Sequence, residues 1–446
     1  MRKNFLKIAG AALFLSAALP LASLAQDNAT GSKTEEKEFY LRPSYWRPYD
    51  QRGINVFETT KEADPIPFEG LRIRFGAGFT QQFQSLKHET KSGIELYEMG
   101  PGFDLAQANL FTDVQLADGI RLHLATYLSA RHHNETWVKG GYIQFDKLPF
   151  KGQFWNDLMK ITTVKIGHME INYGDQHFRR TDGGQALYNP FMENYIADAF
   201  STEIGGEVTL QKNGLFGLVG VTNGTINASI NTQKPDVDNI STKNPAVYAK
   251  AGVDKNISEN LRVRVSGSVY YNNKSQRNVL YGGDRTGSNY WAVMSPKGDD
   301  LKANAFSGRF NPGFSRNIEA YMLNGFVKAG GFELFGTYET AKGNAATAAD
   351  PKKRNMNQFA VDGVYRFGAK ENVFIGARYN TVSAEMPGLT QDVSIDRTAF
   401  AAGWFLTKNI LLKGEYVNQE YKNFAANSIL NGGKFHGYVV EAVVGF

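Results

Sequence analysis

Charged side chains that alternate with apolar ones are the residues of this 446-residue chain best able to do chemistry. Arg72 and Arg74, for example, alternate with Leu71, Ile73 and Phe75. The basic residues in such segments are Arg72, Arg74, Arg121, Lys250, Arg262, Arg264, Arg366, Arg378 and Lys413. The acidic residues are Asp113, Glu203, Glu207, Glu319, Glu333, Glu339, Asp362, Glu415 and Glu441.

Charges at this density indicate an interior that contains water, because a buried ion without a partner costs on the order of several kcal/mol. Arginines gathered toward one end of such an interior would form a basic band that favours anions. In the alternative interpretation, each arginine pairs with a neighbouring carboxylate and only stabilises the wall. The sequence leaves both interpretations open.

A second charged group lies in the segment 174–200, which contains Arg179, Arg180, Asp182 and Glu193. If these side chains face one another across a narrow gap, they would create a transverse field that orients dipolar solutes and rejects apolar ones. The alternative is an ordinary surface loop.

Catalytic and metal-binding patterns are missing from the sequence. It has no cysteine, which excludes disulfides, thiol catalysis and zinc–thiolate sites. It also has no G-x-S-x-G, H-E-x-x-H or P-loop motif. His132 and His133 would point to opposite faces of a strand, which is poor geometry for one metal ion. We therefore expect neither an enzyme nor a cofactor or metal.

The elements that position these residues are strands, because apolar residues recur with a period of two in many segments. Leu261, Val263 and Val265 alternate with Arg262 and Arg264 in the same way as the residues near Leu71. No helical pattern of comparable strength occurs. We predict about 16 strands, over 71–84, 104–117, 120–131, 135–146, 160–173, 201–211, 215–222, 246–254, 260–272, 317–328, 332–340, 357–367, 373–381, 392–405, 410–418 and 434–446.

The connections between these strands alternate between short and long. Asp118-Gly119 and Lys212-Asn213-Gly214 are short, whereas 85–103 and 273–316 are long. Strands that span a membrane need about 9–11 residues, and they must close into a barrel so that every backbone polar group is paired. The pattern therefore predicts an all-β fold, a closed antiparallel transmembrane β-barrel with short periplasmic turns and long extracellular loops. A soluble sandwich or propeller is the alternative.

The N-terminal segment predicts export. Residues 1–25 have a basic start, an apolar stretch from Ile8 to Leu19 and small residues before position 26, which is the pattern of a cleaved signal peptide. A membrane anchor is the alternative, but about a dozen apolar residues are too few to cross a bilayer. We expect a polar tail and an aromatic and proline-rich arm over 26–70, and the barrel over 71–446.

The last strand carries a resemblance to a known family. It ends in Ala442-Val443-Val444-Gly445-Phe446, which resembles the terminal signature of Gram-negative outer-membrane barrels. More narrowly, VKIGHMEINYGD at 164–175 and TEIGGEVTL at 202–210 resemble the phosphate-selective porin O/P-like group of the porin superfamily. No lysine-rich ladder like that associated with phosphate selectivity is present, so the resemblance does not extend to the substrate.

The resemblance implies a location, partners and a constriction. The barrel would lie in the cell outer membrane, contact its lipid, form a homotrimer, and be recognised by the barrel-assembly machinery through the strand ending at Phe446. In 16-stranded porins the loop at the position of 174–200 folds inward and narrows the pore, so Arg179, Arg180, Asp182 and Glu193 would lie at the constriction.

We thus predict an outer-membrane porin, a water-filled channel for passive diffusion of small hydrophilic solutes or ions, with a preference for anions. Nucleic acid is not an expected partner, because the formal charge of +5 falls to 5 − 3 = +2 without Arg2, Lys3 and Lys7 of the leader. An outer-membrane transporter of apolar molecules and a structural or adhesive barrel without an open pore are the alternatives.

Overall fold

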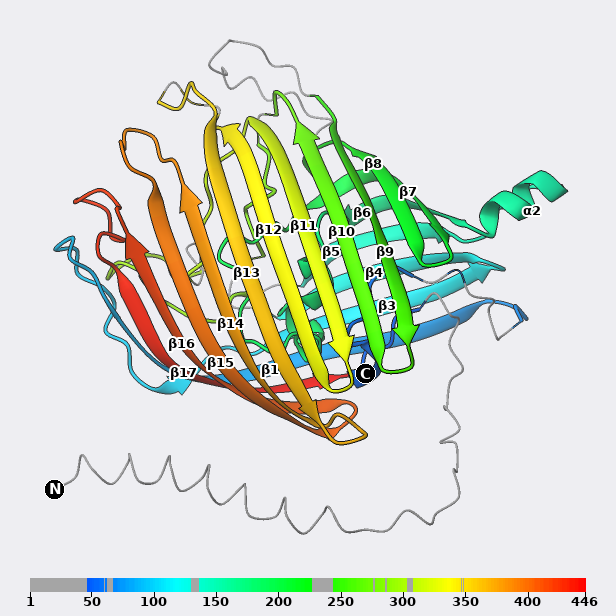
Figure 1. Ribbon diagram of the computed structural model, residues 1–446, viewed down its shortest axis with the longest axis horizontal. Helices are drawn as coiled ribbons and strands as arrows, with labels where there is room; N and C mark the ends of the chain where they lie inside the picture. Colours follow the sequence, from blue (N-terminus) through cyan, green and yellow to red (C-terminus); the bar gives the residue numbers. More distant parts are fainter. Residues whose placement is uncertain are drawn as a thin grey trace, which may run out of the picture. The chain divides into compact units, whose positions relative to one another are not determined.

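An antiparallel sheet closes on itself in the computed structural model (Figure 1). The structure describes residues 46–59, 61, 67–129, 136–226, 244–275, 277–284, 287–302, 308–345, 347 and 349–446. All of them belong to one unit, Pro43–Phe446. The predicted signal peptide 1–25 and the tail up to residue 45 lie outside the described residues. No helix in the described part of the chain is long and apolar enough to cross a membrane.

The wall of the barrel consists of long strands, each paired with its neighbours in the chain. They are β1 (Arg72–Glu89), β3 (Gln107–Ala117), β4 (Ile120–Ser129), β5 (Trp137–Phe145), β6 (Thr162–Glu170), β7 (Thr202–Lys212), β8 (Leu215–Thr222), β9 (Ala246–Ser258), β10 (Leu261–Asn272), β11 (Asn317–Ala329), β12 (Phe332–Asn344), β13 (Arg354–Phe367), β14 (Val373–Ala384), β15 (Val393–Thr407), β16 (Ile410–Lys422) and β17 (Lys434–Gly445). The two-residue β2 (Gly102–Phe103) adds to β1. The described residues thus form the predicted 16-strand barrel.

Strand β1 closes the ring because its two halves pair with different partners. Arg72 to Thr80 pair with β3, and Gly78 to Glu89 pair with the last strand, β17. Closure removes both free edges, so the backbone hydrogen bonds of the wall are satisfied around the whole circumference.

Some strands extend further than their apolar pattern predicts. β1 continues to Glu89 rather than ending at 84, and β16 continues to Lys422 rather than 418. In both cases the extra residues pair with β17, up to Lys434. Beyond the hydrocarbon layer, strands can still pair without an apolar face. The alternation of apolar residues therefore ends before the strand ends.

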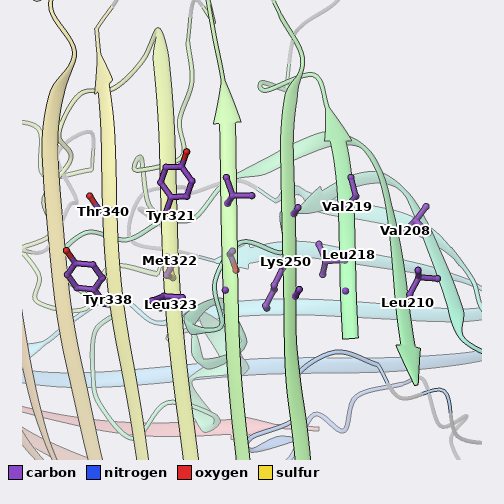
Figure 2. Close-up of a pocket in the computed structure, with 16 residues that line it drawn as sticks. Val208, Leu210, Leu218, Val219, Lys250, Tyr321, Met322, Leu323, Tyr338 and Thr340 are labelled. Carbon is purple, nitrogen blue, oxygen red and sulfur yellow. The ribbon is translucent and has the colours of Figure 1, made fainter. Parts of the chain in front are cut away.

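The outer face of the wall is apolar, as the alternation predicts. Ile73 and Phe75 are exposed on β1. Figure 2 shows part of this face over β7 to β12, where Leu210, Leu323 and Tyr338 line a hollow of about 900 Å³. A continuous surface of this kind is suited to hydrocarbon, because large exposed apolar areas are rare on water-soluble monomers.

The short connections form tight turns at one end of the barrel. Asn213 and Gly214 both have positive φ values, 53° and 78°, as a two-residue hairpin with the right-handed strand twist requires. The chain enters β1 and leaves β17 at this same turn end, whereas the long loops join strands at the other end.

The connection between β5 and β6 contains a helix that the sequence did not predict, α2 (Gln153–Met159). It projects from the turn end of the wall (Figure 1). Its seven residues complete only about two turns, and its large apolar residues Phe154 and Trp155 are exposed. A helix this short, with no buried apolar stripe, leaves no helical period in the sequence.

Three segments fold into the barrel and contact its inner wall. The first is the arm, described over 46–59, whose Tyr49 Oη donates to Asp113 Oδ2 of β3 at 2.8 Å. The second is the loop 171–201, which contains the short helices η4 (Gln176–Arg179) and η5 (Gly183–Leu187). The third is the described part of the loop 273–316, whose Asn289 accepts from Gln82 of β1 at 3.0 Å.

These segments change the interior from the one we expected. Met192 and Leu280 of the two loops belong to one buried apolar cluster with the wall residues Met356 and Val417. The loops therefore occupy part of the interior that we expected to contain water. The alternation in the strands predicts only which side chains of the wall face the interior. It does not predict the apolar side chains that the loops add there.

Candidate functional site

Arg366 and Arg378, two of the arginines expected to line the interior, form ion pairs with buried carboxylates. Arg366 Nε lies 2.9 Å from Glu333 Oε1, and Arg378 Nε lies 2.7 Å from Asp362 Oδ1. Arg378 and Asp362 are direct neighbours across β13 and β14. All four side chains are buried, so these pairs stabilise the wall and present no free charge to a solute.

Arg262 and Arg264 of β10 pair with acidic groups from three parts of the chain. Arg262 Nη2 lies 2.7 Å from Asp254 Oδ2 on the neighbouring strand. Arg264 Nε lies 2.8 Å from Asp175 Oδ2 of the loop 171–201, and Arg264 Nη2 lies 2.8 Å from Glu58 Oε2 of the arm. These contacts fix both inserted segments to β10.

Asp113 of β3 is the centre of another charged cluster. Arg74 Nε donates to its Oδ2 at 3.0 Å, and His123 Nδ1 lies 2.9 Å from its Oδ1. Arg121 Nη1 is 3.7 Å from the same carboxylate. Arg72 lies apart from this cluster, at the start of β1, where its Nη2 donates to the Pro67 carbonyl at 3.0 Å.

The charged residues of the loop 171–201 are buried inside the barrel. Arg180 donates from Nη1 and Nη2 to the two oxygens of Asp198, at 2.8 and 3.0 Å. Burial alone would raise the pKa of Asp198, but Arg180 and Arg309 outweigh it and hold that pKa below its usual value. Asp182 pairs with Lys139 of β5.

Glu193 of the same loop is held by backbone groups. It accepts hydrogen bonds from the N–H of Asn194 at 2.8 Å and of Asn289 at 3.0 Å. Burial raises the pKa of its carboxyl above the usual value, although Arg309 and Arg397 oppose the shift. Glu193 therefore joins the two inserted loops to each other.

The loop also spans to the far wall. The N–H of Ile196 donates to Asn380 Oδ1 of β14 at 2.6 Å, and that of Ala197 donates to Gln358 Oε1 of β13 at 2.9 Å. Lys413 Nζ of β16 donates to the Phe191 carbonyl at 3.0 Å. The loop thus crosses the lumen, because it contacts β13, β14 and β16 on one side and β1, β3 and β5 on the other.

The opposite side of the interior, at β1 and β4 to β6, keeps side chains that reach solvent. The side chains of Arg74, His123 and Lys165 are 17%, 19% and 23% exposed. Their carboxylate partners are almost completely buried: the side chain of Asp113 is 1% exposed and that of Glu207 is 2% exposed. Arg74 and Lys165 therefore reach water more than their own carboxylate partners do, although Glu170 of β6 is also 26% exposed.

Tyr142 of β5 lies beside two members of this strip, which we call the cationic strip and define as Arg74, Arg121 and Lys165. Its ring lies 5.5 Å from Lys165 Nζ and 5.7 Å from the Arg121 guanidinium carbon. The ring holds the two cations apart and attracts both.

Lys165 is the residue of the strip that the sequence analysis missed. It lies in the predicted strand 160–173, between Val164 and Ile166, so the same alternation that identified Arg74 could have found it. The alternation is hard to follow beyond Ile166, because Gly167 contributes no side chain to it. His168, the next residue, pairs with Ile204.

A pocket of about 670 Å³ opens at the turn end beside the strip. Its lining includes Glu58 and Lys61 of the arm and Arg262 of β10. Lys61 Nζ donates to the Thr162 carbonyl at 2.8 Å and lies 3.1 Å from Asp146 Oδ1, which places it just below Lys165 on β6. We call this pocket the turn-end mouth; no residue of the cationic strip is among those that line it.

No protein-family model matches the chain, and no curated protein matches it. Several solved structures are similar to this chain. OmpT of Vibrio cholerae is 10% identical, with a TM-score of 0.50 over 85% of this chain and 99% of that one. An anion-selective porin from Comamonas acidovorans is 8% identical, with a TM-score of 0.50 over 84% and 100%. The outer-membrane channel DcaP of Acinetobacter baumannii is 10% identical, with a TM-score of 0.50 over 84% and 98%. Identities this low establish the fold alone: the chain has the closed β-barrel fold of the outer-membrane porins.

Proposed function

We propose that the chain forms a passive, anion-preferring pore for small hydrophilic solutes and that it lies in the outer membrane of a Gram-negative cell. The observation that carries the proposal is the cationic strip. Arg74 and Lys165 of the strip are 17% and 23% exposed, whereas their partners Asp113 and Glu207 are almost completely buried. An anion in this passage would meet these cationic ends before the buried carboxylates that pair with them, which favours anions over cations.

The membrane location rests on the wall itself. Its backbone is paired around the ring, and its outer face carries exposed side chains such as Phe75 and Leu323. Among β-sheets, only a closed one can cross hydrocarbon with its polar backbone satisfied. The leader 1–25 agrees with export, and the passage requires no cofactor and no catalytic group.

Single-channel recording of the refolded protein in planar bilayers tests the proposal. We expect stepwise currents of uniform size. A folded barrel that gives no steps at any voltage would favour the structural or adhesive alternative. Uptake of apolar probes without ion current would favour a transporter of apolar molecules.

The C-terminal residue supports a proposal about assembly. Phe446 is exposed, and its backbone exchanges hydrogen bonds with Ala77 of β1 at 2.9 and 3.1 Å. We propose that the barrel-assembly machinery recognises this residue. Deleting Phe446 should lower the amount of folded protein in the outer membrane, and an unchanged amount would contradict the idea.

We also propose, from the resemblance, that the protein forms a trimer and is related to the phosphate-selective group. Chemical cross-linking in membranes tests the trimer.

A further inference from the structure

A buried guanidinium inside the barrel has no partner. Arg179 is 4% exposed, and its Nε and Nη1 atoms are buried without a hydrogen-bond acceptor. No carboxylate among the described residues lies within ion-pair distance of it. Its guanidinium carbon lies 4.8 Å from the centre of the Phe335 ring, and Glu333 and Tyr195 interact with it electrostatically. A bare charge in such a place is costly, so the arrangement calls for a counter-ion.

A small cavity lies next to this guanidinium. Gln176, at the other end of η4, lines it together with Arg179, and both polar atoms of the Gln176 amide are also buried without a partner. The volume open to the centre of a water-sized particle is about 10 Å³. That is room for about one water molecule or one ion of similar size.

The charges around the cavity do not balance. Arg179, Arg180 and Arg378 line it, against the carboxylates of Asp198 and Asp362. Each carboxylate is already engaged: Arg180 bonds both oxygens of Asp198, and Arg378 bonds both oxygens of Asp362. Among the three arginines that line the cavity, Arg179 is the one with no bonded carboxylate, and Glu333 of β12 interacts with it only from beyond ion-pair distance.

We propose that this cavity binds one small monovalent inorganic anion, of chloride size, between the Arg179 guanidinium and the Gln176 amide N–H. A water molecule would fill the space but would leave the charge unbalanced. A tetrahedral oxyanion is too large for the space. The cavity is lined from β12, β13 and β14, whereas the cationic strip lies on β1 and β4 to β6. The ion is therefore a fixed part of the folded loop, and the proposal does not depend on ion conduction.

The test uses the purified, detergent-solubilised barrel with sodium bromide as the probe. Crystals grown in bromide should show an anomalous scattering peak beside Arg179. The thermal unfolding midpoint should rise with the logarithm of halide concentration, measured against sodium gluconate at equal ionic strength. Arg179→Gln should abolish both effects, whereas Arg72→Gln, which removes an exposed arginine at the turn end, should keep both.

Several outcomes would overturn the proposal. These are bromide peaks only at surface cations, an unfolding midpoint that is the same in halide and gluconate, or a halide dependence that persists in Arg179→Gln. If Arg179→Gln does not fold, Gln176→Leu provides a second test, because it keeps the charge and removes one donor. It should raise the halide concentration needed for stabilisation, and an unchanged concentration dependence would contradict the site.

Discussion

At the scale of single residues, the interior separates charges by exposure rather than by number. The sequence contains similar numbers of basic and acidic residues at inward positions, so counting alone predicts no selectivity. Burial changes this balance, because Arg74 and Lys165 reach water while Asp113 and Glu207 do not. Which member of an ion pair remains exposed depends on packing around it, and this information is absent from the alternation pattern.

Lys165→Gln tests the strip directly. A unit charge about 4 Å from a permeating ion contributes about 1 kcal/mol in water, so we expect the anion-to-cation permeability ratio to fall by roughly fivefold. The reversal potential of the variant in a KCl gradient measures the ratio.

Lys147→Gln is the matched control for this change. Lys147 pairs with Asp118 in an exposed position at the turn end, so its neutralisation removes the same charge outside the strip. We expect the reversal potential of the control to equal that of the unmodified protein. Equal reversal potentials for Lys165→Gln and Lys147→Gln would exclude the strip from selectivity.

Asp362→Asn tests the structural role of the buried pairs. The change leaves the Arg378 guanidinium buried without its carboxylate, which should cost about 3–5 kcal/mol of unfolding free energy. Urea unfolding in detergent, followed by tryptophan fluorescence, measures the loss. Asp396→Asn breaks an exposed pair with Lys422 and should cost at most about 1 kcal/mol. Similar losses of unfolding free energy in the two variants would show that the buried pair stabilises the protein no more than the exposed pair does.

At the scale of elements, the arm is the part of the chain that most affects the turn-end mouth. Glu58 lies 2.9 Å from Lys250 on β9, and Asn55 Nδ2 donates to Glu333 of β12 at 2.7 Å. Tyr49 reaches Asp113 on β3. The arm therefore extends across the turn end of the barrel between walls that are distant in the sequence, and its residues line the turn-end mouth.

Removal of residues 46–59 should widen this entrance. We expect a larger single-channel conductance, and a stronger anion preference because Lys250 and Arg264 lose the Glu58 carboxylate. Planar-bilayer recording measures both. Removal of residues 26–38 of the polar tail, at a similar length, is the control and should leave conductance unchanged. An arm-deleted protein that folds and conducts like the intact one would contradict the role given to the arm.

The elements also show how far the sequence predicts the structure. Period-two patterns such as Leu71, Ile73 and Phe75 located the strands and their lipid-facing side, because the wall repeats one local rule. The pairing of Arg378 with Asp362 was left as an alternative, since it depends on the register of two strands. The path of the loop 171–201 and the position of the arm depend on contacts between distant residues, such as Ile196 with Asn380, and no local pattern encodes them.

At the scale of the whole molecule, the barrel combines an apolar exterior with an interior that is partly filled by loops. The loops 171–201 and 273–316 pack against β8 to β17 and β1 through an apolar cluster. Charged side chains that still reach solvent include Arg74 of β1, Lys165 of β6 and Arg262 of β10. A filled interior makes the passage narrow, so a few cations dominate its field.

The reversal potential of single channels of the unmodified protein in a KCl gradient tests this account most directly. The account predicts stepwise currents whose reversal potential has the sign of chloride permeation. A reversal potential with the sign of potassium permeation, or a folded barrel that passes no current, would contradict it.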